Sequence, residues 1–342
     1  CLLEKGSEIG AHTLSGAVIE TRALDELLPE WRTANAPIST EVATDEFYFL
    51  TGSNSSIRVP RVFVPASMHN QGNHIVSLGD VCRWLGEQAE LLGVDVFPGF
   101  AAAQLLLGND GVVRGVTTGE MGLSATGRPK ESHEAGINII AKQTVFAEGS
   151  RGHLGRQLIE RFNLGAEADP QHYALGLKEI WEVVPSKHKV GKVVHGAGWP
   201  LTKGSRGGFF LYHTDKSQVV VGLIVDLNYT NPYLSPYGEF QRLKLHPLIR
   251  RVLEGGSRIA YGARSITKGG ENSLPRQTVR GGVIVGCNAG TLNFAKIKGT
   301  HTAMMSGMIA AETIFEVFES GADEGVELTD LPRRLRRSWL RD

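Results

Sequence analysis

The chain has 342 residues, of which 41% are hydrophobic and 21% charged, and its 36 basic residues are balanced by 36 acidic ones. This composition is that of a globular protein long enough to bury a sizeable core. It excludes both a disordered chain and a disulfide-stapled mini-protein. Because nucleic-acid-binding domains are usually strongly basic, the balanced charge also argues against a nucleic-acid partner.

The three cysteines, Cys1, Cys82 and Cys287, are far apart in the sequence. They exclude a disulfide framework, a cysteine-rich zinc site and a four-cysteine iron-sulfur cluster formed within this chain. No apolar run approaches the roughly 18–20 residues that a membrane-spanning helix needs. The first five residues, CLLEK, have the pattern of the end of a buried strand. We therefore expect the chain to be part of a longer protein.

The first half of the chain alternates between predicted helix and strand. Apolar residues recur at helical spacing over residues 80–92, and Gly93 leads from this helix into a short strand at 94–97. Further strands are predicted at residues 102–107, 112–117, 137–141 and 144–147.

From about residue 168 the pattern changes to long β-rich segments, at 173–184, 208–212, 219–227 and 259–264, interrupted by one predicted helix at 239–253. These segments predict a mostly antiparallel sheet. A buried strand is then predicted at 282–286 and a helix at 299–320. The chain thus returns to the alternation of helix and strand seen in its first half.

Glu4 ends the first predicted strand, and a glycine-rich stretch at residues 10–16 follows it. In a dinucleotide-binding βαβ unit, an acidic residue at the end of a strand accepts hydrogen bonds from the adenosine ribose. Gly10 and Gly16, with His12 between them, would let the backbone approach a flat ring or a phosphate closely. Taken alone, these features are also consistent with a surface glutamate and an ordinary loop.

Two more glycine turns follow buried strands. Glu148 and Gly149 lead into one helix, and Gly286 and Gly290 precede Gly299, which opens the last long helix. The N-terminus of a helix favours negative charge, as on the pyrimidine edge of a reduced flavin. These glycine-rich features, in this order, predict an FAD-binding domain.

The predicted fold is therefore mixed α/β (α+β). It consists of a Rossmann-like FAD/NAD(P)-binding domain of the glutathione-reductase type, with an inserted, mostly antiparallel β-sheet substrate domain.

Six colinear segments then carry a closer resemblance: GSEIGAHTLSG at 6–16, GEQAELLGVDVFP at 86–98, FAEGSRGH at 146–153, NPYLSPYGEFQ at 231–241, RIAYGAR at 258–264 and KIKGTHTAM at 296–304. Together they resemble the electron transfer flavoprotein-ubiquinone oxidoreductase family, over residues 1 to about 320. The resemblance implies a peripheral membrane enzyme that holds FAD and one 4Fe-4S cluster. Such an enzyme takes electrons from reduced electron transfer flavoprotein and passes them to ubiquinone.

The resemblance also implies a location, at the bacterial cytoplasmic membrane or the matrix side of the mitochondrial inner membrane. The pyrophosphate loop of the FAD site is expected before Cys1, and the cluster cysteines after Asp342. The implied domains are a partial FAD-binding domain at 1–167, a ubiquinone-binding sheet domain at 168–275, a return to the FAD-binding domain at 276–322, and a C-terminal tail at 323–342.

Carried over residue by residue, the resemblance implies FAD contacts at Glu4 for the ribose and at Val96 for the adenine end. It implies Gly10, His12 and Gly16 in the loop beside the flavin, and Glu148 and Gly149 in the second turn. Near the flavin ring it implies Asn272, Gly286, Gly290, Gly299, Thr300, His301 and Thr302. Gly207 and Gly208 match a glycine pair whose backbone meets the quinone head group. No catalytic side chain and no metal ligand is implied within the chain.

Two segments remain outside these assignments. Residues 57–68 combine apolar side chains, two arginines and two prolines. This pattern predicts a loop that dips into lipid headgroups, with an edge strand packed on its own domain as the alternative. The basic run at 333–337 is typical of a solvated amphipathic end, and a functional basic patch is the alternative.

Other functions stay open on the same fold. An aromatic-ring monooxygenase usually carries Asp-Gly in place of Glu148-Gly149 and Asp in place of Cys287, and both differences count against it. An FAD-dependent prenyl-lipid reductase and a non-catalytic scaffold that binds quinone or lipid are the remaining alternatives.

Overall fold

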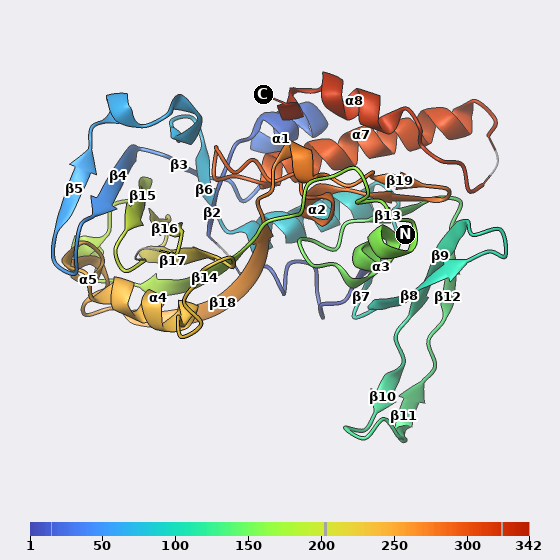
Figure 1. Cartoon of the computed structure of the whole chain (residues 1–342), viewed down its shortest axis with the longest axis horizontal. Helices are drawn as coiled ribbons and strands as arrows, with labels where there is room; N and C mark the ends of the chain where they lie inside the picture. Colours follow the sequence, from blue (N-terminus) through green and yellow to red (C-terminus); the bar gives the residue numbers. More distant parts are fainter. Residues whose placement is uncertain (15, 202–203, 323, 342) are drawn as a thin grey trace.

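The computed structural model of the chain describes residues 1–14, 16–201, 204–322 and 324–341. Figure 1 shows a large sheet on one side of the molecule, and smaller sheets with the long helix α7 (Thr300–Glu319) on the other. The fold therefore combines a mostly antiparallel sheet with an α/β part, as the sequence predicts.

The large sheet has seven strands in the order β18-β14-β17-β16-β15-β4-β5, and every pair is antiparallel except β15 with β4. The strands are β4 (Thr44–Leu50), β5 (Ser56–Val59), β14 (Tyr173–Glu182), β15 (Lys192–Gly198), β16 (Gly207–His213), β17 (Gln218–Asp226) and β18 (Ser257–Thr267). Strands β4 and β5 come from the range that we assigned to the first domain, so the sheet draws on more of the chain than the predicted segment.

Neighbouring side chains of the central strand β17 point to opposite faces of the sheet, and both faces are covered. Val219 and Val221 pack in one cluster with Phe240 and Leu243 of α4 (Pro236–Leu245), whereas Val220 lies in a second cluster on the other face. We predicted one helix over 239–253, but it is divided into α4 and α5 (Pro247–Leu253). The division falls before Pro247, which disfavours helical backbone at the residue preceding it.

The remaining strands form small sheets. Parallel pairing joins β1 (Leu2–Glu4) to β7 (Val96–Pro98), and β13 (Thr144–Phe146) to β20 (Gly282–Ile284), which also pairs with β19 (Thr278–Val279). The other two three-stranded sheets are β2 (Ala17–Ile19), β6 (His74–Val76) and β3 (Thr40–Glu41), and β12 (Asn138–Ile140), β9 (Val113–Thr118) and β8 (Ala102–Leu107). The other helices are α1 (Arg22–Leu27), α2 (Leu78–Leu91), α3 (His153–Arg161), α6 (Gly286–Ala289) and α8 (Leu331–Arg337).

Short 3-10 helices connect several of these elements: η1 (Pro29–Arg32), η2 (Arg61–Phe63), η3 (Ala66–Met68), η4 (Pro185–Lys187), η5 (Glu271–Ser273) and η6 (Trp339–Arg341). Among the described residues, none of the helices is both long and apolar enough to pass through a membrane.

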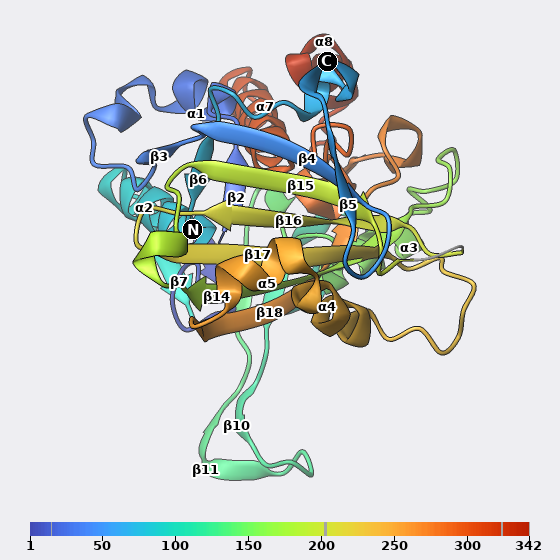
Figure 2. The same cartoon turned by 90° about the vertical axis from the view of Figure 1, so that its left-hand side faces the viewer.

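A hairpin arm extends from the body of the molecule. It is formed by β10 (Met121–Leu123) and β11 (Pro129–Glu134), which pair antiparallel, and both views show it projecting away from the sheets (Figures 1 and 2). The sequence shows only a turn-rich stretch here, because the strands are short and mostly exposed and therefore lack a hydrophobic pattern.

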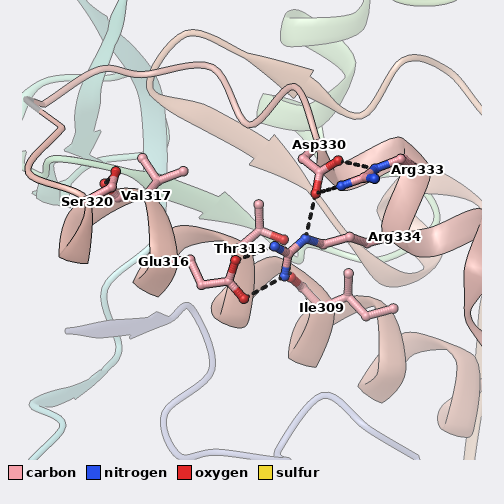
Figure 3. Close-up of polar contacts among 8 residues, drawn as sticks. All are labelled: Ile309, Thr313, Glu316, Val317, Ser320, Asp330, Arg333 and Arg334. Carbon is pink, nitrogen blue, oxygen red and sulfur yellow. Dashed lines mark hydrogen bonds and ion pairs between the residues drawn. The ribbon is translucent and has the colours of Figure 1, made fainter.

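The C-terminal segment is docked on the α/β part. Leu331 of α8 is buried in a cluster with Val283 and Ile309. Figure 3 shows Arg334 bound to both Glu316 of α7 and Asp330, while Arg333 also binds Asp330. Since these two arginines are paired within the chain, they favour the amphipathic end over a free basic patch.

Candidate functional site

The first candidate segment follows β1. Glu4 lies at the end of this strand, where its Oε1 accepts a 2.6 Å hydrogen bond from the backbone N–H of Gly6. Val96, on β7, is the register partner of Leu2. The strand pair therefore places Glu4 and Val96 at one small parallel sheet, as an adenosine site of the dinucleotide-binding type requires.

The loop after β1 is held against two other elements. Gly10 has a φ of 85°, and a Cβ there would lie 2.4 Å from the carbonyl oxygen of Gly79, at the start of α2. Gly16 has a φ of 95°, and a Cβ there would lie 2.4 Å from Val220 of β17. Only glycine fits both contacts, so the loop joins the α/β part to the large sheet. Ser15, between them, lies outside the described residues.

Two cations of the large sheet bind this loop through its carbonyl groups. Lys178 Nζ donates to the carbonyl of Gly16 at 3.2 Å, and Arg264 donates to the carbonyl of His12. Burial, together with the nearby charge of Arg264, lowers the pKa of Lys178 to about 8. Lys178 was not among the predicted site residues, although a lysine within an apolar strand is itself an unusual feature of the sequence.

The second candidate segment is the turn after β13. The Glu148 carboxylate accepts from the backbone N–H of Gly155 at 2.7 Å and of Leu154 at 3.3 Å, so it caps helix α3. Its Oε1 is 3.4 Å from Nδ1 of His153. Gly149 has a φ of 83°, and a Cβ there would meet open space. The turn is thus fixed by Glu148, while its backbone at Gly149 stays accessible.

The third candidate segment runs from α6 to the start of α7. Gly286 donates its backbone N–H to Ser306 of α7 at 2.9 Å, and Gly290 ends α6 with a φ of 97°. Gly299 is the N-cap residue of α7 and has no side chain to cap it. Thr302 Oγ1 donates to the carbonyl of Gly299 at 2.8 Å. The first N–H groups of α7 are therefore available to a ligand, because they have no partners within the helix.

Strand β18 brings the three segments together. Arg264 binds the loop at His12, and the next residue, Ser265, is 2.6 Å from Ser150 in the second segment. Just beyond the last residue of β18, Lys268 Nζ lies 4.3 Å from the ring centroid of Phe294 in the third segment. Segments that are more than a hundred residues apart in sequence thus border one end of one strand.

A direct contact also joins the second and third segments. Asn288 Nδ2 donates to the carbonyl of Phe146 at 3.4 Å, and Cβ atoms at Gly152 and Gly155 would lie 2.9 and 2.3 Å from the Asn288 Oδ1. These glycines therefore let α3 approach α6 closely, which the sequence pattern alone did not predict.

Asn272 lies in η5, next to the third segment. Its carbonyl accepts a 2.8 Å bond from the N–H of Asp169. Gln171 connects this region to Gly290, since a Cβ on Gly290 would lie 2.6 Å from Gln171 Nε2. Gln171 was not among the predicted site residues.

His301 is placed differently from its glycine neighbours. Its ring is buried and lies parallel to the ring of Trp339, with centroids 5.8 Å apart. Burial lowers the pKa of His301 to about 4, against the opposing effect of Glu20, whose carboxylate is 3.9 Å away. The neutral ring therefore packs between Glu20 and the C-terminal segment, and the part of His301 suited to a cofactor is its backbone N–H.

Gly207 and Gly208 begin strand β16. A Cβ on Gly207 would lie 1.9 Å from the carbonyl oxygen of Ile224 on β17, and one on Gly208 would lie 2.8 Å from that of Gly196 on β15. Close strand packing therefore requires both glycines, independently of any ligand.

The residues of the three segments fit an FAD group. Thr291 Oγ1 is buried without a hydrogen-bond partner in the described part of the chain. The next residue, Leu292, lies against Gly299 at the uncapped start of α7. Open space at Gly149 and the free N–H groups of α7 provide room and donors for a flat, polar ring. The chain does not fit an iron-sulfur cluster: within the described ranges the three cysteines are free, and no group of three or more His, Cys, Asp or Glu could hold a metal ion.

Solved structures share the fold of this chain at low sequence identity. A geranylgeranyl bacteriochlorophyll reductase-like protein from Thermoplasma acidophilum matches with a TM-score of 0.66 and 17% identity, over 93% of this chain and 72% of that one. A flavoprotein/dehydrogenase from Cytophaga hutchinsonii matches with a TM-score of 0.60 and 14% identity, over 94% and 73%. The chain therefore has the FAD-binding Rossmann-type fold of FAD-dependent oxidoreductases and halogenases.

Sequence comparisons define the relationship more narrowly. The family described as "ETF-QO, ubiquinone-binding" matches residues 173–266. Electron transfer flavoprotein-ubiquinone oxidoreductase from Pseudomonas aeruginosa is 56% identical over 100% of this chain and 62% of its own length. The mitochondrial human protein of that name is 48% identical over 99% of this chain and 56% of its own length. Over its whole length the chain is similar to electron transfer flavoprotein-ubiquinone oxidoreductases, and it spans about three fifths of the length of these relatives.

Proposed function

We propose that this chain is the flavin- and quinone-binding part of an enzyme that transfers electrons from reduced electron transfer flavoprotein to ubiquinone. The observation that carries the proposal is the gathering of three glycine-rich segments at one end of β18, with the uncapped N-terminus of α7 among them. The similarity over the whole chain supports it. FAD, when bound, supplies the redox chemistry.

The proposed tasks of the chain's own residues are to bind and to orient. Glu4 accepts from the ribose, and the backbone around Gly149 and Gly290 lies against the cofactor. The N–H groups of Thr300 to Thr302 would hold the pyrimidine edge of the flavin, and their partial positive charge would favour the reduced form. Gly207 and Gly208 offer backbone contacts to the quinone head group. No side chain needs to act as a nucleophile in this chemistry.

Two parts of the activity are proposed to come from residues outside this chain. β1 pairs only with β7, and β13 only with β20, so within the described residues each keeps one unpaired edge. We propose that a parallel strand from outside this chain pairs with one of these edges and leads into the pyrophosphate loop of the FAD site. The 4Fe-4S cluster is likewise assigned to residues outside this chain.

A spectrum and an assay test the proposed function. The full-length protein should show the yellow colour and the visible absorption of a bound flavin. It should reduce ubiquinone analogues when supplied with reduced electron transfer flavoprotein. Colourless protein that takes up no FAD would favour the non-catalytic scaffold, and oxygen consumption driven by NADPH without quinone would favour the monooxygenase.

The proposed membrane contact is peripheral, at the bacterial cytoplasmic membrane or the mitochondrial inner membrane. Only Ile57–Val59 of the predicted docking segment lies in a strand, β5, at the edge of the large sheet. Val62 and Phe63, which follow it, are 82% and 75% exposed. Apolar side chains this exposed, with Arg58 and Arg61 beside them, suit insertion among lipid headgroups.

We expect a Val62→Ser and Phe63→Ser double variant to bind anionic liposomes at least tenfold more weakly than the unaltered protein, because it loses the apolar area that enters the lipid. Sedimentation with liposomes measures this. Phe315→Ser is the control, since Phe315 is also exposed, at 65%, but lies on α7. Equal sedimentation of all three proteins would reject the docking role of this segment.

A further inference from the structure

The first turn of α7 begins without a capping side chain. Its N-cap residue is Gly299, which has no side chain to accept from the free N–H groups. The hydroxyl of Thr302 donates to the carbonyl of Gly299 at 2.8 Å, so it does not bind these N–H groups either. A helix start without a cap tends to fray. If this turn binds a cofactor, contacts from other parts of the chain have to hold it in place.

His301, in this turn, is held by packing more than by hydrogen bonds. It is 1% exposed, and its Nδ1 has no hydrogen-bond partner among the described residues. Its Nε2 lies 3.9 Å from Glu20 Oε2, which is too long for a hydrogen bond. Its ring lies at 4° to the ring of Trp339, with the centroids 5.8 Å apart. Offset parallel stacking of this kind is favourable, so Trp339 fixes the orientation of the His301 ring.

Trp339 is itself anchored to α1. Its Nε1 donates to Glu26 Oε1 at 2.9 Å. The guanidinium carbon of Arg22 lies 4.7 Å from the centroid of the indole, a distance typical of a cation–π contact. Figure 1 shows the C-terminal end of the chain beside α1 and α7. The indole is therefore held between α1 and the first turn of α7.

The residues around Trp339 are also fixed to the α/β part. Leu340, the next residue, packs against the buried cluster that contains Ile309 of α7. Arg334 of α8 binds Glu316 of α7 (Figure 3). Since η6 and α8 are both attached to α7, Trp339 has a rigid support from which to hold His301.

We propose that Trp339 is a positioning residue of the FAD site. By fixing the ring of His301, it holds the first turn of α7 in the conformation in which the N–H groups of residues 300–302 bind the flavin. This inference rests on the proposed function. Trp339 acts through His301 and does not need to touch the cofactor. A turn that is already ordered before FAD arrives does not have to be ordered on binding, and affinity is higher for that reason.

Replacement of the indole tests the proposal through the FAD affinity of the full-length protein. Trp339→Leu removes the stacked ring and the N–H group, and should weaken FAD binding roughly tenfold, about the cost of ordering the backbone of one more residue on binding. Trp339→Phe keeps a flat ring over His301 and should stay within about threefold of the unaltered protein. Titration of the flavin-free protein with FAD, followed by flavin fluorescence, measures both.

Trp199→Leu is the matched control. Trp199 is half-buried, like Trp339, and its ring centroid lies 5.8 Å from that of His246. The guanidinium of Arg242 lies 5.4 Å from the same ring. Trp199 packs on the core cluster of the large sheet, however, and not on α7. Its replacement should leave the FAD affinity unchanged.

Two further readouts separate positioning from a general loss of stability. In the flavin-free protein, Trp339→Leu should speed hydrogen exchange at Ala303, whose N–H binds the carbonyl of Gly299, and leave the second half of α7 unchanged. In the FAD-bound protein, the midpoint potential of the flavin should become more negative, because the N–H groups that favour the reduced form are less well placed. Trp339→Phe should restore both.

Glu26→Ala keeps the proposal testable if Trp339→Leu does not fold. Glu26 is exposed on α1, so the variant leaves the core intact, but it removes the acceptor of the indole N–H. We expect FAD binding to weaken about threefold, as for the loss of one exposed hydrogen bond. Unchanged affinity in this variant would contradict the anchoring of Trp339 by α1.

The outcomes distinguish the two ideas. Unaltered full-length protein that binds no FAD would refute the proposed function. Unaltered protein that binds FAD, with Trp339→Leu equal to it in affinity, hydrogen exchange and potential, would overturn this inference alone. An equal loss of affinity in Trp199→Leu, or a loss in Trp339→Leu that Trp339→Phe does not restore, would assign Trp339 to general stability and would also overturn it.

Discussion

Gly207→Ala is expected to destabilise the protein by on the order of 4 kcal/mol, near the upper end of single substitutions. The added Cβ would lie 1.9 Å from the carbonyl oxygen of Ile224, and the φ of 151° disfavours any residue with a side chain. The strands β16 and β17 would have to separate in the middle of the large sheet. Urea unfolding, followed by far-UV circular dichroism, measures the change.

Gly270→Ala provides the matched control. Gly270 also has a positive φ, of 75°, but a Cβ there would meet no atom within 4 Å. Its cost should be the backbone preference alone, about 1–2 kcal/mol. If Gly207→Ala were as stable as this control and lost only quinone reduction, the glycine pair would serve the quinone and not the packing of the sheet.

Acidification between pH 6.5 and 4 is expected to unfold the protein progressively. His195 and His213 are buried, and burial lowers the pKa of each to about 4, so both stay neutral in the folded state. In the unfolded chain they take up protons near pH 6.5. The unfolded state therefore binds more protons within this window, and stability falls as the pH falls. Above pH 6.5 the effect is absent.

His213→Gln should flatten this dependence. Each buried histidine contributes up to about 1.4 kcal/mol per pH unit within the window. Glutamine can still accept the 3.1 Å bond from the N–H of Lys189, but it takes up no proton. Urea midpoints measured from pH 7 to pH 4 give the slope, with the exposed His172→Gln as the control. An unchanged slope in His213→Gln would show that His213 is not buried neutral in solution.

Most of the α/β part could be predicted because its elements have strong local signals. The helical spacing over 80–92 corresponds to α2, and the apolar runs at 144–147 and 282–286 contain the parallel strands β13 and β20. The turn glycines could also be predicted from the sequence, because backbone with a positive φ, as at Gly149 and Gly290, favours glycine.

The contacts between distant segments could not be predicted in this way. Strand β15 contains a buried histidine and two glycines, so it lacks the expected apolar alternation. The docking of Trp339 on His301, and of Arg264 on the loop at His12, depends on tertiary geometry that no local pattern records. Lys298 lies within the segment KIKGTHTAM, but its burial is visible only in three dimensions.

The central claim is that residues 6–16, 148–152 and 286–302 contact one FAD molecule. Hydrogen-deuterium exchange of the full-length protein, with and without FAD, tests it most directly, because backbone N–H groups near the cofactor exchange more slowly when it is bound. We expect slower exchange in all three segments together on addition of FAD, and unchanged exchange in the projecting hairpin β10–β11. Slower exchange in none of them, or in only one, would contradict the account.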